Sequence, residues 1–130
     1  MAAKFYSTGA QGEVDLTTTI QDIVTGQTSG SDVRRLILIN TGSTDRNVQF
    51  YDENDKYIDN VLVPANAGLA PGSAGATRPA VDVLNGAYIA GSELDAYGNR
   101  YYRLWSAKKI RAKQIVGTDV QLQWSRSDYE

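Results

Sequence analysis

Apolar and polar residues alternate along most of this chain with a period of two. The alternation is clearest at residues 120–125, where Val120, Leu122 and Trp124 are separated by glutamines. Successive side chains of a β-strand point to opposite faces of the sheet, so this period predicts strands that are buried on one face. The same pattern predicts strands at residues 14–20, 33–39, 48–51, 61–63 and 101–105.

Two segments depart from a simple alternation. Residues 33–39 are apolar on both faces after their arginines, which predicts a central strand covered on both sides. Residues 106–116 fit a short helix capped by Ser106, or a strand with Ile110 and Ala112 on one face. We favour the strand, because Gly-Thr-Asp at residues 117–119 then forms a hairpin turn into the last strand.

Short turn sequences rich in glycine, asparagine and aspartate separate the predicted strands. Many short strands with such turns, and no long amphipathic helix, indicate an all-β fold. The expected architecture is an antiparallel β-sandwich or jelly-roll-like barrel. The 130 residues suit one domain, and we assign residues 13–130 to a single β-sandwich domain.

Two stretches lack the alternation. Residues 1–12 are mostly polar and predict an extended N-terminal arm, whereas residues 64–80 contain all three prolines and much glycine and alanine. A loop this long is usually functional or disordered, so it is either a surface loop or a segment that orders against a neighbouring subunit. The candidate partner-binding residues of the arm and the loop are Phe5, Tyr6, Leu69 and Arg78.

The chain contains neither cysteine nor histidine. Their absence excludes disulfides, thiol catalysis, cysteine-based zinc sites and any Ser-His-Asp triad. Carboxylate pairs remain as candidate catalysts, but among 15 acidic residues some pair always lies at a suitable distance and nothing marks one out. We therefore predict that the protein is not an enzyme and needs no cofactor.

No segment of the sequence fits a signal peptide or a membrane span. The longest wholly apolar run, Leu36–Ile39, is far shorter than the roughly 20 residues that a transmembrane helix needs. We therefore expect synthesis in the cytoplasm and no membrane partner. The net charge of -2 also argues against general affinity for nucleic acid.

An acidic patch at residues 52–60 raises the question of a cation site. Asp52 and Asn54 match two positions of a calcium loop, but Lys56 occupies the next ligand position and no glycine follows. A hairpin turn explains the same residues, because Asn and Asp tolerate the left-handed backbone of such turns. We favour the hairpin and assign no metal.

A basic segment lies between Ala96 and Thr118, where six basic residues occur without an acid. Aromatic residues interleave with its first half, as in proteins that bind single-stranded nucleic acid. The basic and acidic segments are alternatively complementary surfaces for association between copies, or simply solvated strand faces. The candidate charged association surfaces comprise Asp52, Glu53, Asp55, Asp59, Arg100, Arg103, Lys108, Lys109, Arg111 and Lys113.

Five motifs follow one another along the chain: a central strand ending in "LINTG", the polar-to-aromatic strand "NVQFY", the rim "VLVPANAG" and the returning strands "VLNGAYIAGSE" and "VGTDVQLQWS". Their order resembles that of the small β-sandwich proteins of tailed-phage virions. The resemblance spans about residues 14–124 and contains no catalytic signature. The four basic residues within residues 106–116 depart from the neutral final strands of that family.

The resemblance implies a virion structural protein, synthesised in the host cytoplasm. A capsid decoration or cement protein is expected, which stabilises the particle by contacts with its own copies and with a major capsid protein. One alternative is an accessory protein of the neck or tail. Another is a carbohydrate- or surface-binding module whose stacking platforms are Tyr97, Tyr101, Tyr102 or Trp105.

Overall fold

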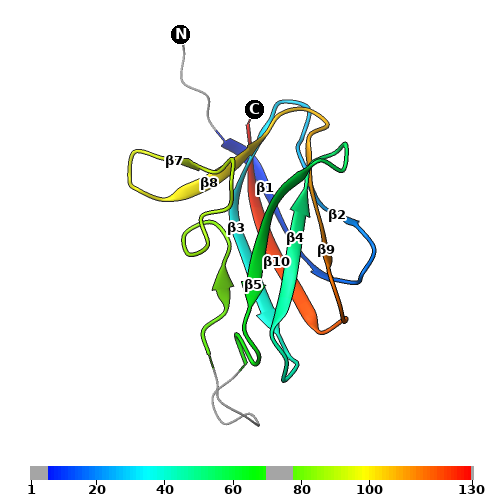
Figure 1. Cartoon of the computed structure of the whole chain (residues 1–130). Helices are drawn as coiled ribbons and strands as arrows, with labels where there is room; N and C mark the ends of the chain where they lie inside the picture. The colour runs from blue at the N-terminus through cyan, green and yellow to red at the C-terminus, as the bar shows by residue number, and fades with distance from the viewer. Residues whose placement is uncertain (1–5, 70–77, 130) are drawn as a thin grey trace.

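A computed structural model of the chain describes residues 6–69 and 78–129, which form two antiparallel sheets (Figure 1). The larger sheet contains β1 (Tyr6–Asp15), β3 (Ser31–Asn40), β6 (Val81–Asp82), β7 (Glu93–Leu94), β8 (Arg100–Leu104) and β10 (Val120–Tyr129). The smaller sheet contains β2 (Gln21–Thr25), β4 (Arg46–Tyr51), β5 (Tyr57–Val63) and β9 (Lys109–Gln114). The prediction of an all-β, antiparallel fold is confirmed.

The chain crosses from one sheet to the other at most of its connections. The larger sheet has the order β1-β10-β3-β8-β7 with β6 also beside β3, and the smaller has the order β2-β9-β4-β5. Of the strands that follow one another in the chain, only β4 with β5 and β7 with β8 are paired neighbours. Most of the pairing therefore joins residues that are far apart in the sequence.

The hydrophobic core contains apolar side chains from both sheets. Phe50 of β4 and Ile110 of β9 are fully buried, as are Leu36 and Leu38 of β3 and Leu122 of β10. Burying each side chain of this size contributes roughly 1.5–3 kcal/mol. In the parts of the chain that the structure describes, no helix is long and apolar enough to cross a membrane.

The strand interpretation of residues 106–116 is confirmed over β9, but the predicted hairpin after it is wrong. β9 pairs with β2 and β4, whereas β10 pairs with β1 and β3. Residues 117–119 therefore lead the chain from the smaller sheet to the larger one. Thr41 N–H donates to the Asp119 carbonyl (3.0 Å), and the Asp119 carboxylate pairs with Arg46 (2.9 Å).

The segment predicted as one strand at residues 14–20 is divided between two structures. Its first two residues end β1, and residues 16–20 connect β1 to β2 in the other sheet. Leu16 is fully buried, and Thr17 N–H donates to the Gln21 side chain (3.0 Å). The alternation of Val14, Leu16, Thr18 and Ile20 therefore continues past the end of β1, into the segment where the chain changes sheets.

β3 is central in its sheet, as its apolar sequence predicts. It lies between β10 on one side and β6 and β8 on the other. Leu36 and Leu38 are buried in the core, whereas Ile37 and Ile39 on the opposite face are only half-buried. One face of β3 is therefore buried and the other is only partly covered, whereas the sequence predicted cover on both faces.

The predicted N-terminal arm at residues 1–12 is not confirmed. From Tyr6 onward the chain belongs to β1, and residues 8–15 pair with residues 121–128 of β10. A side chain on Gly12 would lie 2.9 Å from the Trp124 ring, so a glycine is required where this ring packs. Phe5 lies outside the described residues.

The predicted loop at residues 64–80 is described only at its two ends. Asn40 N–H donates to the Ala67 carbonyl (2.9 Å), and Gly68 N–H donates to the Arg78 carbonyl (2.7 Å). Ala67 is fully buried, while Leu69 is only half-buried and Arg78 is exposed. The buried apolar anchor of the described part is therefore Ala67 rather than Leu69.

The Asn-Thr-Gly turn after β3 is fixed by the buried side chain of Asn40. Its amide nitrogen donates to the carbonyls of Thr44 (2.9 Å) and Val63 (3.2 Å). Its amide oxygen accepts from Gly42 N–H (2.9 Å). One side chain thus connects the end of β3, the following turn and the end of β5.

We expect Asn40→Ala to lower the free energy of unfolding by about 2–3 kcal/mol, because it leaves buried backbone groups without partners. Thr41→Ala, which removes a more exposed hydrogen bond to Asp119 (3.2 Å), is the control and costs about 1 kcal/mol or less. Urea unfolding at constant m-value measures both changes. Equal losses for the two variants would contradict a special role for Asn40.

Candidate functional site

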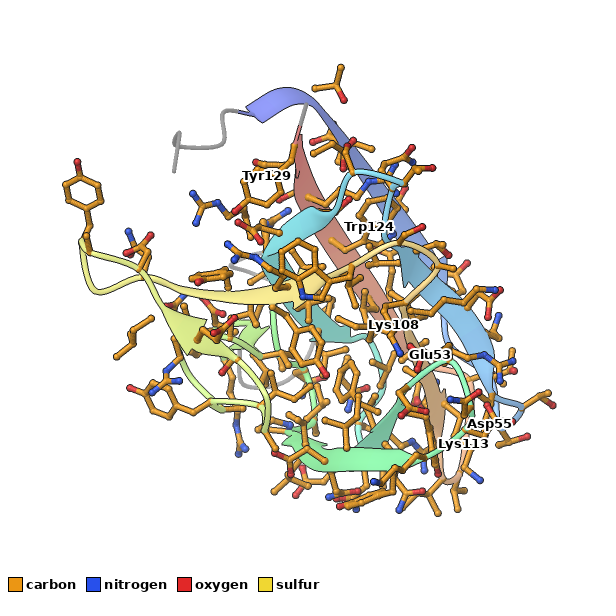
Figure 2. The ribbon with its side chains drawn as sticks, turned by 90° about the horizontal axis from the view of Figure 1, so that it is seen from above. Glu53, Asp55, Lys108, Lys113, Trp124 and Tyr129 are labelled. Carbon is orange, nitrogen blue, oxygen red and sulfur yellow. The ribbon has the colours of Figure 1, made fainter. Side chains whose placement is uncertain are left out.

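The acidic and basic segments predicted as separate surfaces meet in one molecule. The β4–β5 turn places Glu53 beside the start of β9, where its carboxylate accepts from Lys109 N–H (3.1 Å). Lys108 Nζ lies 3.5 Å from the second Glu53 oxygen (Figure 2). The two charged segments therefore pair with each other within the chain.

Asp22 of β2 extends this ion-pair cluster across the smaller sheet. It binds Lys109 (2.9 Å) and Arg111 (2.8 Å), and Arg111 also pairs with Asp55. Hydrogen bonding from Lys109, followed by that from Arg111, lowers the pKa of Asp22. The carboxylates of these pairs are exposed to solvent, so the pairs contribute little to stability.

The remaining acidic residues of the hairpin stabilise local structure. Asp52 accepts from the N–H groups of Lys56 (2.9 Å) and Asn54 (2.8 Å), and these bonds lower its pKa. Asp55 has a φ of 60°, the left-handed conformation expected for the turn. Asp59 accepts from Ala90 N–H (3.0 Å).

No metal-binding group of three or more acidic residues occurs within residues 6–69 and 78–129.

Arg103 belongs to a network at the other end of the basic segment. Its guanidinium binds both oxygens of Asp32 (2.7 and 3.2 Å), and the hydroxyl of Tyr129 also donates to Asp32 (2.6 Å). Asp32 is only 2% exposed, and its hydrogen bond raises the pKa of Arg103. The network joins β3, β8 and β10, and Figure 2 shows Tyr129 near the end of β10.

A second buried carboxylate, Asp128, lies close to this network. It accepts from Ser31 (2.7 Å), Arg126 (2.9 Å) and Thr8 (3.1 Å). Burial raises the pKa of Asp128, but hydrogen bonds, that from Ser31 foremost, outweigh burial and leave the pKa below its ordinary value. Asp32 and Asp128 were not predicted as site residues. The hydrogen-bond partners of each carboxylate come mainly from other strands, and the sequence alone does not say which strands pair.

The other predicted basic residues contact aromatic rings. Lys113 lies over the Tyr51 ring (6.0 Å), Arg100 over the Tyr88 ring (4.9 Å) and Arg103 over the Trp105 ring (5.4 Å). A guanidinium over a ring is a cation–π contact that stabilises the side chains involved. Arg103, Lys108 and Lys109 line one hollow together with Asp52 and Glu53, so carboxylates lie among these basic residues.

The four predicted stacking aromatics occupy different environments. Tyr97 is 91% exposed in the turn between β7 and β8, and Trp105 is 51% exposed after β8. Tyr101 lies between the guanidiniums of Arg34 (5.9 Å) and Arg103 (5.2 Å). Tyr102 packs against the core, and burial raises its pKa. They do not form a single binding platform.

Among the edge strands that the structure describes, β1 is the longest. Leu16 N–H donates to the Val120 carbonyl (2.9 Å). The backbone N–H and C=O groups of every second residue before Leu16 therefore also face β10. The backbone groups of Gly9, Gln11, Glu13 and Asp15 consequently point away from β10, along the edge of the sheet. We call this row the β1 edge.

Arg103→Ala removes the cation from the buried Asp32 carboxylate. We expect it to lower the free energy of unfolding by about 3 kcal/mol, as for a broken buried ion pair. Arg111→Ala is the matched control and lowers the free energy of unfolding much less, because its partners are exposed. Urea unfolding measures the free energy of unfolding of both variants. Equal decreases in the two variants would contradict a larger contribution of the buried network.

The pKa shifts predict how stability depends on pH. Asp22, Asp52, Asp95 and Asp128 all have a lowered pKa in the folded state. Their contribution is present above the unfolded-state value of 3.8 and is lost as pH falls through the folded-state values. Without histidine, we expect a nearly constant free energy of unfolding between about pH 8 and 5, and a steep decrease below about pH 4.

Urea unfolding at a series of pH values measures this dependence. Asp128→Asn removes one titrating group, so the decrease below about pH 4 becomes shallower in this variant. A fall in stability between about pH 7 and 5 would contradict the assignment of the acid dependence to these carboxylates.

The described residues thus offer four features with a possible role in function: the ion-pair cluster, the buried network, the exposed aromatics and the β1 edge. No protein-family model, no curated protein and no solved structure matches this chain.

Proposed function

We propose that this chain is a non-enzymatic structural protein of a tailed-phage virion that assembles through the β1 edge. The observation behind the proposal is a ten-residue strand whose outer backbone groups point away from its sheet. Such an edge is a template for pairing with another strand. The resemblance of the sequence to small virion β-sandwich proteins supports an assembly on a particle, in which the chain acts as a decoration or cement protein.

The β1 edge is better suited to pairing than the edges of the smaller sheet. β2 has only five residues, and its register is interrupted in the middle, between Asp22 and Val24. The interruption in β1 lies at its start, between Tyr6 and Thr8, so residues 8–15 keep one register. β5 is approached by a later segment, because Asp59 accepts from Ala90 N–H (3.0 Å). β1 contains neither proline nor lysine, the residues that commonly protect an edge from pairing.

Two copies of β1 can pair about a twofold axis without bringing like charges together. When Gln11 faces its own copy in an antiparallel pair, Glu13 faces Gly9 of the second chain. Acidic residues directly opposite each other would destabilise the pair, and this register avoids that. The interface is then the same patch on both subunits, as in most symmetric dimers.

The strand order supports the finer architecture as well. The long strands follow the orders β1-β10-β3-β8 and β2-β9-β4-β5, with most connections crossing between sheets. We assign this arrangement to the jelly-roll class, which is common in capsid and lectin domains. The β1 edge remains available for other copies, and a major capsid protein is the proposed second partner. An accessory position on the neck or tail is the alternative.

Substitutions at Gln11 test assembly through this edge. Gln11→Lys places two lysines opposite each other in the twofold pair, and Gln11→Pro removes an outward N–H group. We expect both to shift a dimer towards the monomer in analytical ultracentrifugation, with the fold retained by circular dichroism. Leu62→Lys changes an exposed residue of β5 and is the control.

A wild-type chain that stays monomeric at high concentration would overturn assembly through the edge. Dissociation by Leu62→Lys with no effect of either Gln11 variant would overturn it as well.

The virion assignment is tested on purified particles of the phage that encodes the chain. We expect mass spectrometry to detect the protein in the particle, in a copy number set by the particle's symmetry. A copy number in the hundreds supports a lattice position, and one of a dozen or fewer supports the neck or tail. Absence from washed particles would overturn the virion proposal in both forms.

A further inference from the structure

A groove lies beside the β7–β8 hairpin, which projects from the body of the two sheets (Figure 1). Its volume is about 370 Å³, within the range of small-molecule sites. The groove is lined by Arg34, Asn85, Asp95, Tyr97, Asn99 and Arg100. Five of these six side chains end in planar polar groups, and the sixth is an aromatic ring.

Hydrogen bonds hold the wall of this groove in place. One oxygen of Asp95 accepts from the N–H groups of Tyr97 and Asn99 (both 2.9 Å), and the other lies 3.4 Å from Arg34. The Asn99 bond, with the others, lowers the pKa of Asp95, so its carboxylate is ionised at neutral pH. The backbone of the turn that carries Tyr97 is therefore preorganised by the chain itself.

Several binding groups in the groove remain available. The Asn85 oxygen accepts from Arg100 N–H (2.8 Å), which fixes this amide and leaves its nitrogen for another acceptor. No hydrogen bond joins the Asn99 side chain to any described residue. Tyr97 is 91% exposed, so its ring face is open to a ligand.

The groove also has an unbalanced positive charge. Arg34 is paired with Asp95, but no carboxylate of the described residues lies within ion-pair distance of Arg100. Arg100 is held by Ser92 (3.2 Å) and by the Tyr88 ring (4.9 Å). The Nε of Arg100 is buried, so a carboxylate in the groove would be bound by the two terminal nitrogens of the guanidinium.

We propose that this groove binds an acidic sugar, a pyranose ring that carries a carboxylate. The apolar face of the ring stacks on Tyr97, and Arg100 binds the carboxylate. The hydroxyl groups form hydrogen bonds with the amides of Asn85 and Asn99. The site is separate from the β1 edge, because β1 and the β7–β8 hairpin lie at opposite ends of the larger sheet.

The test is a titration of the whole chain with D-glucuronate, followed by two-dimensional NMR, with D-glucose as the neutral comparison. We expect saturable shifts at residues 95–100 with D-glucuronate at millimolar concentrations, and binding of D-glucose at least about tenfold weaker, the effect of one charge-assisted contact. Arg100→Gln removes the preference between the two sugars. Tyr97→Ala and Asn99→Ala each weaken D-glucuronate binding.

Tyr57→Ala is the matched control, because Tyr57 is an exposed tyrosine on β5, outside the groove. It leaves D-glucuronate binding unchanged, as does Gln11→Lys. Absence of saturable shifts with D-glucuronate in the wild-type chain would overturn the proposal. Equal binding of the two sugars by the wild-type chain, or equal loss in Tyr57→Ala and Tyr97→Ala, would overturn it too.

Discussion

The position of β10 between β1 and β3 is the constraint on which the rest of the structure depends. β10 pairs along nearly its whole length with both neighbours. Its inward side chains, Val120 and Leu122, are buried in the core, while Asp128 binds side chains of β1 and β3. Without β10, β1 has no partner in its sheet. The edge proposed for assembly therefore exists only because β10 holds β1.

Buried charges at one end of the larger sheet make that arrangement specific. Asp32 and Asp128 lie on neighbouring strands, and each carboxylate has an arginine and a hydroxyl donor. A buried carboxylate without these donors costs several kcal/mol, so a shifted register of β3 against β10 would be strongly disfavoured. The largely exposed pairs of Asp22 with Lys109 and Arg111 contribute much less.

The sequence predicts individual strands better than their partners. The alternation at Val120–Trp124 and at Ile110–Gln114 identifies β10 and β9, because one face of each lies in the core. The same alternation contains no information on pairing, so the turn between them was predicted as a hairpin. β1 was missed because Gly9 and Gly12 interrupt its pattern, and Gly12 is required by a ring on another strand. Charge segregation likewise suggested two surfaces, since Glu53 and Lys109 meet only after β4 and β9 pair.

The pairing of β1 with β10 also orders events during translation. The ribosome synthesises β1 more than a hundred residues before it completes β10, and at typical rates this interval lasts on the order of ten seconds. During that time the apolar residues of β1 and β3 lack their shared neighbour. A nascent chain in this state exposes two strand edges, so a holdase chaperone or a delay in collapse would protect it from aggregation. The native sheet forms only when the last strand leaves the exit tunnel.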